Sequence, residues 1–142
     1  MKVLPLNVIL ILTVLTSYKN FELSQCSRTE RWFSQGYEDA KTGVTMYLPS
    51  VIEFKPDTIT IKNANPKLSK QRVNYLILSK KCDWDKAGLS GIAEYRIRMV
   101  SNKNTATLIL KATDGKGTLI IQMDDNSVYS PKLDVTKLID KR

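Results

Sequence analysis

The chain has 142 residues, with 22 lysines and arginines, 14 aspartates and glutamates, a net charge of +8, two cysteines and no histidine. The lack of histidine excludes Ser-His-Asp and Cys-His catalysis, and it removes the commonest general base and metal ligand. We therefore predict a protein that is not an enzyme and that has no cofactor and no metal site. An enzymatic alternative would need a carboxylate of raised pKa, such as Asp83 with a partner that the sequence does not identify.

The N-terminal segment is typical of an export signal peptide. Lys2 precedes an uncharged run from Val3 to Tyr18, which contains an apolar block from Val8 to Leu15. The run is shorter than the roughly 20 apolar residues of a membrane-spanning helix. We predict an export signal peptide over residues 1–25 and a single secreted or periplasmic domain over residues 26–142. That domain would have no transmembrane segment after leader removal; an uncleaved anchor is the alternative.

The two cysteines, Cys26 and Cys82, both follow the apolar block. An even number of cysteines in an exported chain indicates a disulfide, so we predict a bridge between them. The sequence Leu23-Ser24-Gln25-Cys26 is similar to a bacterial lipobox, although Gln25 stands where such boxes have Gly, Ala or Ser. A lipid anchor at Cys26 is therefore the alternative to the disulfide, and two free thiols are the third choice.

The first part of the mature chain predicts a series of short strands. Trp32 and Phe33 open a first strand or a short helix, and the local sequence does not decide between them. The next runs are rich in β-branched or aromatic residues and are separated by polar residues or proline. They are Val44 to Leu48, Val51 to Phe54, Thr58 to Ile61 and Val73 to Ser79, with Pro49, Pro56 and Pro66 placed between them.

The strongest prediction is an antiparallel meander of three strands in the second half. Residues 93–100 alternate apolar and polar side chains, and residues 105–112 and 118–123 follow after short polar turns. Asp114-Gly115 is a hairpin signal, because glycine tolerates a positive φ. Near the end, we expect Asp134 to cap a short helix that holds Val135, Leu138 and Ile139. The whole pattern predicts an all-β, up-and-down antiparallel meander of seven or eight strands, with a barrel favoured over a sandwich.

The order of these features resembles small exported lipocalin-like β-barrel proteins. The features are an early tryptophan (Trp32), an early hairpin over Val51 to Ile61, Cys82-Asp83-Trp84, and Gly91 leading into Tyr95. The Gly-x-Trp of lipocalins proper is absent, because Glu30 and Arg31 precede Trp32. The resemblance implies an up-and-down barrel that sometimes holds a small apolar ligand and has no catalytic activity. It transfers no binding residue to this chain.

Period-two alternation predicts which side chains fill the barrel. The predicted interior residues are Ile59, Ile61, Tyr75, Ile77, Tyr95, Ile97, Met99, Leu108, Leu110, Leu119, Ile121 and Met123. Among them, Tyr75, Tyr95, Met99 and Met123 are candidate ligand-binding residues, because methionine adapts its shape and tyrosine has a polar tip. Trp84 is a fifth candidate, placed over the barrel mouth by a loop that the disulfide tethers. The alternative is a packed core without a ligand.

Two groups of basic residues offer a second interpretation of the function, as a contact surface. Lys67, Lys70 and Arg72 lie at one end of a predicted strand, and Lys80 and Lys81 lie at the other end. A strand of about eight residues spans roughly 26 Å, so both groups cannot share one rim without a bend.

We therefore expect a non-catalytic binding protein for a small hydrophobic or amphipathic ligand. The alternative is an envelope or extracellular interaction protein that contacts a protein partner or an anionic surface through rim loops 62–72 and 83–91. Nucleic acid is not an expected partner, because the chain has no aromatic cluster of the RNP type.

Overall fold

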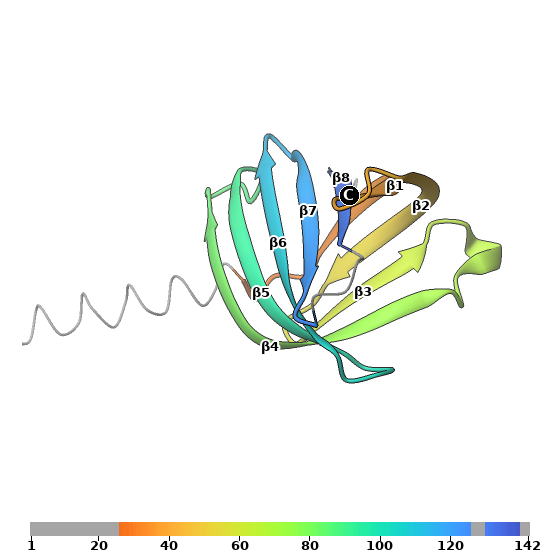
Figure 1. The fold of residues 1–142 in the computed structure, drawn as a ribbon. Coiled ribbons are helices and arrows are strands. Elements are labelled where there is room, and N and C mark those ends of the chain that lie inside the picture. Colours follow the sequence, from red (N-terminus) through yellow and green to blue (C-terminus); the bar gives the residue numbers. More distant parts are fainter. Residues whose placement is uncertain (1–25, 126–129, 140–142) are drawn as a thin grey trace, which may run out of the picture.

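The computed structural model describes residues 26–125 and 130–139, and in that part the chain forms an eight-stranded antiparallel barrel (Figure 1). Each strand pairs with the next in the sequence, and β1 also pairs with β8, which closes the barrel. The strands are β1 (Glu30–Asp39), β2 (Thr45–Phe54), β3 (Thr58–Asn63), β4 (Arg72–Trp84), β5 (Gly91–Met99), β6 (Thr105–Thr113), β7 (Lys116–Met123) and β8 (Pro131–Leu138), with one short 3-10 helix, η1 (Pro66–Leu68). The predicted all-β meander and the barrel are confirmed. The predicted signal peptide lies outside the described residues.

The barrel interior is filled by the residues that the alternation predicted. Eight of the twelve are buried and the other four, Ile61, Ile77, Met99 and Met123, pack partly buried against the same core. A fully buried aliphatic or aromatic side chain contributes about 1.5–3 kcal/mol through the loss of apolar surface from water. The core also contains residues outside the prediction, namely Cys26, Trp32, Ile52, Phe54, Cys82, Trp84, Ala93, Ala106, Ala112, Leu133 and Val135.

The up-and-down topology gives the barrel two different ends. The short connections 55–57, 85–90 and 114–115 lie at one end, together with the start of β1 and the end of β8; we name it the disulfide end. The connections 40–44, 64–71 and 100–104 lie at the other end, which we name the arm end. The connection between β6 and β7 places Asp114 at φ 51° and Gly115 at φ 74°, so the predicted tight hairpin is confirmed.

The structure corrects three local predictions. The runs Val44–Leu48 and Val51–Phe54 form one strand, β2, and Pro49 lies inside that strand. The strand tolerates Pro49, which has no N–H to donate, because the β1–β2 register is irregular there. The Pro49 carbonyl still accepts a bond from the Ala64 N–H at 2.8 Å. Cys82 to Trp84 belong to the 13-residue strand β4, so the loop begins only at Asp85.

The third correction concerns the C-terminal segment, where the predicted helix is wrong and β8 forms. Leu133 and Val135 are buried while Asp134 and Thr136 are exposed, which is the period of a strand. β8 pairs with β7 along one edge and with β1 along the other, and closure of the barrel therefore decides its structure. The sequence left a strand and a helix open at Trp32, and in the structure Trp32 lies in a strand, β1.

The disulfide end is closed by a bridge, two stacked indoles and an ion pair. Cys26 and Cys82 are joined with their Cα atoms 5.6 Å apart, which confirms the predicted disulfide. The rings of Trp32 and Trp84 stack with centroids 6.1 Å apart. Lys137 Nζ donates to Glu30 Oε2 at 2.9 Å and to the Gly88 carbonyl at 2.6 Å, and lies 5.7 Å from the centre of the Trp32 ring. This end therefore ties the first and last strands together.

A charged cluster on the outer surface links β5, β6 and the turn after β7. Arg96 donates to both carboxylate oxygens of Asp124, and the Thr105 hydroxyl donates to the same carboxylate. These bonds lower the pKa of Asp124 to about 2, with Arg96 as the largest cause. The Asp124 carboxylate therefore joins Arg96 of β5 and Thr105 of β6 at the outer surface.

The Asp124 cluster predicts acid sensitivity. Because the folded-state pKa of Asp124 lies below its ordinary value of 3.8, the stability that it contributes is present above pH 4 and is lost as the pH falls toward 2. We expect the melting temperature of the native chain to fall more steeply between pH 4 and pH 2 than that of Asp124→Asn, as measured by circular dichroism. Asp39 and Asp85, whose pKa values are also lowered by backbone N–H donors, contribute to the slope that remains in the variant. Identical pH profiles would contradict the assignment.

Candidate ligand-binding groove

The pairing between β1 and β8, which we name the seam, is irregular. Phe33 pairs with Thr136, and the next pair along the seam is Glu38 with Lys132. Between these pairs β1 has one residue more than β8, so the strands do not stay in register. Irregular pairing of this kind disrupts the ladder locally and bends the strand. The seam is therefore the part of the wall where the surface is hollowed.

A bulge in β1 fixes the shape of the seam. The Ser34 hydroxyl donates to the Gly36 carbonyl at 2.6 Å and accepts from the Gly36 N–H at 3.3 Å. The β1–β2 register shifts at the same place, between Ser34 and Gly36. A Cβ atom on Gly36 would lie 2.2 Å from the Met46 carbonyl oxygen, so only glycine allows β2 to approach this closely.

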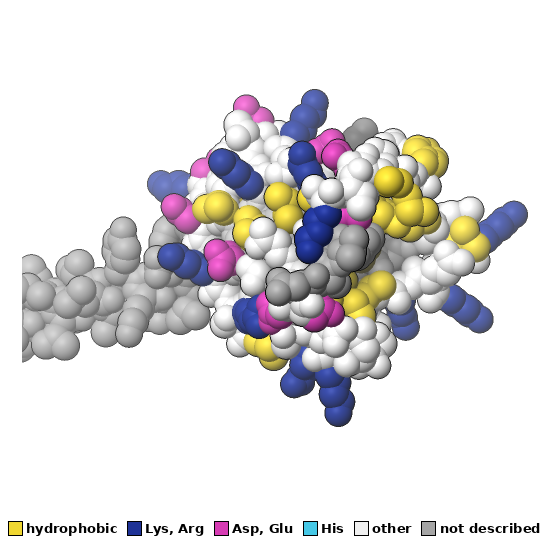
Figure 2. All heavy atoms as spheres, viewed as in Figure 1, with side chains coloured by type: hydrophobic (Ala, Val, Ile, Leu, Met, Phe, Trp, Pro, Cys, Tyr) yellow, Lys and Arg dark blue, Asp and Glu magenta, His cyan; other side chains and the backbone are white. Residues whose placement is uncertain are grey.

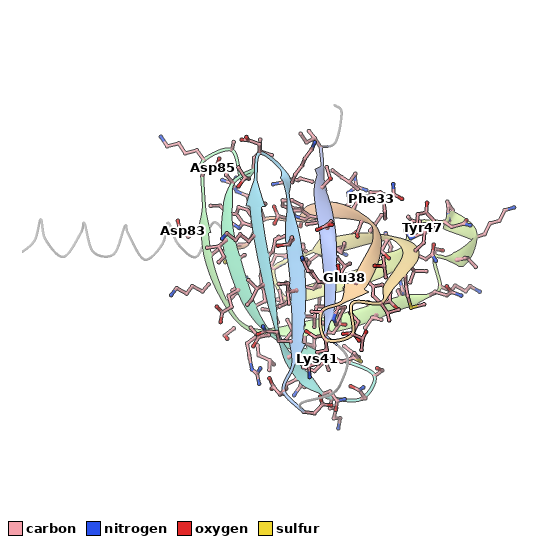
Figure 3. All side chains as sticks on the ribbon, turned by 45° about the horizontal axis from the view of Figure 1, so that its top comes forward. Phe33, Glu38, Lys41, Tyr47, Asp83 and Asp85 are labelled. Carbon is pink, nitrogen blue, oxygen red and sulfur yellow. A yellow bond between two sulfur atoms is a disulfide. The ribbon has the colours of Figure 1, made fainter. Side chains whose placement is uncertain are left out.

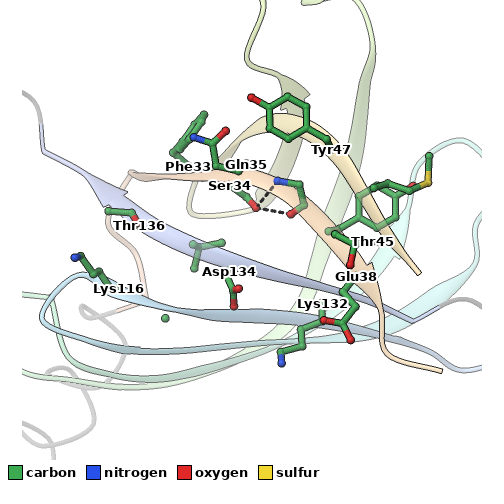
Figure 4. Close-up of a pocket in the computed structure, with 15 residues that line it drawn as sticks. Phe33, Ser34, Gln35, Glu38, Thr45, Tyr47, Lys116, Lys132, Asp134 and Thr136 are labelled. Carbon is green, nitrogen blue, oxygen red and sulfur yellow. Dashed lines mark hydrogen bonds between the residues drawn. The ribbon is translucent and has the colours of Figure 1, made fainter. Parts of the chain in front are cut away.

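The groove at this seam has a volume of about 600 Å³ and is lined by residues of β1, β2, β7 and β8 (Figure 4). Its lining residues are Phe33, Ser34, Gln35, Gly36, Tyr37, Glu38, Thr45, Met46, Tyr47, Lys116, Gly117, Lys132, Asp134, Val135 and Thr136. Small-molecule sites usually have about 300–1,000 Å³. The groove therefore has the size of a site for a small molecule.

One wall of the groove is apolar and open to solvent. It consists of Phe33 and Tyr37 from β1 and of Met46 and Tyr47 from β2. Tyr47 is 79 % exposed and Met46 is 51 % exposed, and exposed apolar side chains that adjoin in one patch often mark a binding surface. The Tyr37 hydroxyl donates to the Met46 sulfur at 2.9 Å, which holds these two side chains together.

The opposite wall carries both signs of charge. Lys116 comes from the start of β7, and Lys132 and Asp134 come from the outer face of β8. Glu38 lies across the seam from Lys132, and Figure 4 shows Lys116, Asp134, Lys132 and Glu38 spread along the lower half of the view. A polar group bound here would meet both donors and acceptors, next to an apolar surface.

None of the five predicted ligand residues lines this groove. Tyr75 and Tyr95 are buried in the barrel, and burial raises the pKa of both phenols above the ordinary value, so both stay neutral. Met99 and Met123 are the last residues of β5 and β7 and pack partly buried near the arm end. Tyr75 pairs with Met99 across β4 and β5. Tyr75, Met99 and Met123 all belong to the core at the arm end of the barrel.

Trp84 lies far from that group, at the disulfide end. It is 8 % exposed and stacks on Trp32, and the bridge at Cys82 lies two residues before it on β4. Tyr95 lies between the two groups, with its ring 5.3 Å from Phe54 and its hydroxyl oxygen 3.7 Å from the Cys82 sulfur. The structure therefore places the predicted ligand residues along the barrel axis and not around one pocket.

The two carboxylates after Cys82, those of Asp83 and Asp85, lie in different structural settings. Asp83 is exposed on β4. Asp85 begins the loop, where its Oδ1 accepts the N–H groups of Leu89 at 2.9 Å and Ser90 at 3.3 Å. Figure 3 shows both side chains on the side of the barrel away from Phe33 and Tyr47. Across residues 26–125 and 130–139, no three His, Cys, Asp or Glu side chains gather in a way that could hold a metal ion.

The two predicted rim loops lie at opposite ends of the barrel. Loop 62–72 connects β3 with β4 at the arm end, and loop 83–91 connects β4 with β5 at the disulfide end. The whole of β4 separates them, and it also separates Lys67, Lys70 and Arg72 from Lys81. The Lys80 Nζ donates to the carbonyl of Pro56, in connection 55–57 at the disulfide end, at 2.8 Å. A flat partner surface would therefore contact one loop or the other.

The sequence does not predict the groove, because the residues that line it follow no regular alternation of apolar and polar side chains. The run Val44–Leu48 predicts a strand correctly, but four of its five side chains are large, apolar and exposed. The sequence signal was the lack of apolar-polar alternation in this run, which distinguishes it from the strands of the meander.

Comparisons with known proteins give no family for this chain. It matches no protein-family model, and no curated protein is significantly similar to it. In the described part of the chain, we find no helix that combines the length and the apolar character needed to cross a membrane.

Proposed function

We propose that this protein is an exported, non-catalytic binding protein that holds a small amphipathic molecule in the groove between β1 and β8. The observation that carries the proposal is the pairing of an exposed apolar wall with a wall of mixed charge in one groove of about 600 Å³. An apolar ligand body would cover Met46 and Tyr47, whose exposure otherwise leaves apolar surface in water.

The charged wall supports a particular class of ligand. Lys116 and Lys132 supply donors, and Glu38 and Asp134 supply acceptors. A zwitterionic or amide-containing polar end satisfies both kinds of group, whereas a simple fatty acid satisfies only the lysines. The proposal that the protein is not an enzyme rests on the absence of histidine from the chain.

A fluorescence titration with anilinonaphthalene sulfonate, an amphipathic aromatic probe, tests the proposal. We expect Met46→Ser/Tyr47→Ser to weaken probe binding about tenfold, because partial burial of two large apolar side chains is worth about 1–2 kcal/mol. Both residues are more than half exposed, so the fold should tolerate the change. Val100→Ser, which changes a side chain that is 54 % exposed outside the groove, is the matched control.

A second pair of variants separates the groove from the barrel interior. Met99→Ala and Met123→Ala remove predicted pocket walls that do not line the groove. If these variants weaken probe binding and Met46→Ser/Tyr47→Ser does not, the ligand occupies the interior and the groove proposal fails. Native mass spectrometry of the exported protein then identifies any natural ligand by the mass that is lost on denaturation.

A further inference from the structure

The hairpin of β3 and β4 extends beyond the other strands at the arm end (Figure 1). Its tip, residues 62–72, contains Lys62, Lys67, Lys70 and Arg72 and no acidic residue. We name residues 62–72 the basic arm. Figure 2 shows Lys and Arg side chains around this projection, with a hydrophobic side chain exposed among them.

The four cations of the basic arm are poorly neutralised. Lys62 lies directly opposite Arg72 in the β3–β4 register, and like charges in that position destabilise a strand pair. Lys62 Nζ lies 3.8 Å from Glu53 Oε2, and Glu53 also pairs with Lys55 at 3.1 Å. Among the residues that the structure describes, no acidic side chain pairs with Lys67, Lys70 or Arg72. An external anion would relieve this repulsion.

The tip of the basic arm also carries an exposed apolar side chain, Leu68, between Lys67 and Lys70 in the sequence. Leu68 is the last residue of η1 and is 41 % exposed. The tip that carries Leu68 is held by its own hydrogen bonds: the Leu68 N–H donates to the Asn65 carbonyl at 2.9 Å, and the Gln71 N–H donates to the Leu68 carbonyl at 2.9 Å. The Lys67 N–H also donates to the Asn65 side chain at 3.0 Å. The backbone that carries Leu68 is therefore held by hydrogen bonds before binding, so little backbone entropy is lost when the tip binds.

We propose that the basic arm docks the protein on an anionic phospholipid surface, with Leu68 inserted among the acyl chains and the four cations at the headgroups. Basic residues close to such a surface each add to the binding through attraction to the anionic headgroups, and a buried apolar side chain adds to this. A soluble polyanion satisfies the lysines and Arg72 but leaves Leu68 in water. The exposed leucine is the reason to prefer a lipid surface. This proposal uses the arm end alone and does not depend on the groove.

Sedimentation with lipid vesicles tests the basic arm in the full chain. The vesicles contain phosphatidylcholine alone or phosphatidylcholine mixed with phosphatidylglycerol. We expect binding only to the mixture, with a partition coefficient that Lys67→Glu/Lys70→Glu lowers by about 30-fold or more, because two favourable cations are lost. Lys86→Glu/Lys111→Glu makes the same change of net charge on exposed residues elsewhere, and we expect it to lower binding less than threefold.

The apolar part of the proposal has its own variant. Leu68→Ser is expected to weaken binding to the mixed vesicles about tenfold, whereas Leu78→Ser, which alters an exposed leucine on β4, leaves it unchanged. Equal losses in the two charge-reversed variants would mean that net charge alone is responsible, and this would overturn the proposal. Wild-type vesicle binding by Leu68→Ser, together with loss of retention on a heparin column by Lys67→Glu/Lys70→Glu, would make the partner a polyanion and would also overturn it.

Discussion

Replacement of both Cys26 and Cys82 by serine is expected to lower the free energy of unfolding by about 4 kcal/mol. The bridge joins residues 56 positions apart, and in the chain-entropy model a loop of this length gives a loss of that size on removal. For the roughly 110 residues that the structure describes, this corresponds to a fall in melting temperature on the order of 15 °C. Thermal unfolding followed by far-UV circular dichroism measures it.

The control for this prediction is chemical reduction. A reductant should destabilise the native chain by the same amount and leave the Cys26→Ser/Cys82→Ser variant unchanged. If the variant melts at the temperature of the oxidised native chain, the remaining contacts of the disulfide end, chiefly the Glu30–Lys137 pair, hold the first strand without the bridge.

The core of the barrel was predictable because its signal is local. In β5 to β7 each inward side chain is two residues from the next, and hairpin turns connect neighbouring strands. Tyr95, Ile97, Leu108 and Leu119 could therefore be assigned to the interior without knowledge of the rest of the fold. The prediction that the cysteines pair also needed no geometry, because the chain has only two of them.

The seam was not predictable in the same way, because it forms between strands at opposite ends of the sequence. β8 has weak local signals, and its sequence predicts a short helix that begins after the Asp134 cap. Pairing with Phe33 on β1 and with Lys116 on β7 determines its structure instead. The groove arises from the mismatch in that long-range register, so no local pattern in β1 or β8 could indicate it.

The predicted ligand residues, the groove and the basic arm lie in different parts of the barrel. The predicted ligand residues extend from Trp84 at the disulfide end to Met99 and Met123 near the arm end. The proposed groove lies on the side wall and the basic arm projects from one end. Changes in the groove and in the basic arm should therefore act independently on ligand binding and on lipid binding, since additivity is usual for sites without shared contacts.

Two replacements of Trp32 distinguish how much the packing of the indole ring and how much its N–H group contribute to the free energy of unfolding. Trp32 is fully buried, it stacks on Trp84, and its Nε1 has no hydrogen-bond partner among the described residues. We expect Trp32→Ala to lower the free energy of unfolding by about 3–5 kcal/mol, because it opens a large cavity. Trp32→Phe should cost no more than about 1 kcal/mol, since the loss of ring volume is offset by removal of an unsatisfied donor.

Urea unfolding followed by far-UV circular dichroism measures both Trp32 variants, because replacing one of only two tryptophans changes the fluorescence signal itself. An unchanged m-value would show that the unfolded state is comparable among the proteins. A cost for Trp32→Phe as large as that for Trp32→Ala would mean that the indole N–H makes a bond that stabilises the folded chain. A small cost for both would instead mean that the Trp32–Trp84 stack and the Lys137 cation contribute little to closure of the disulfide end.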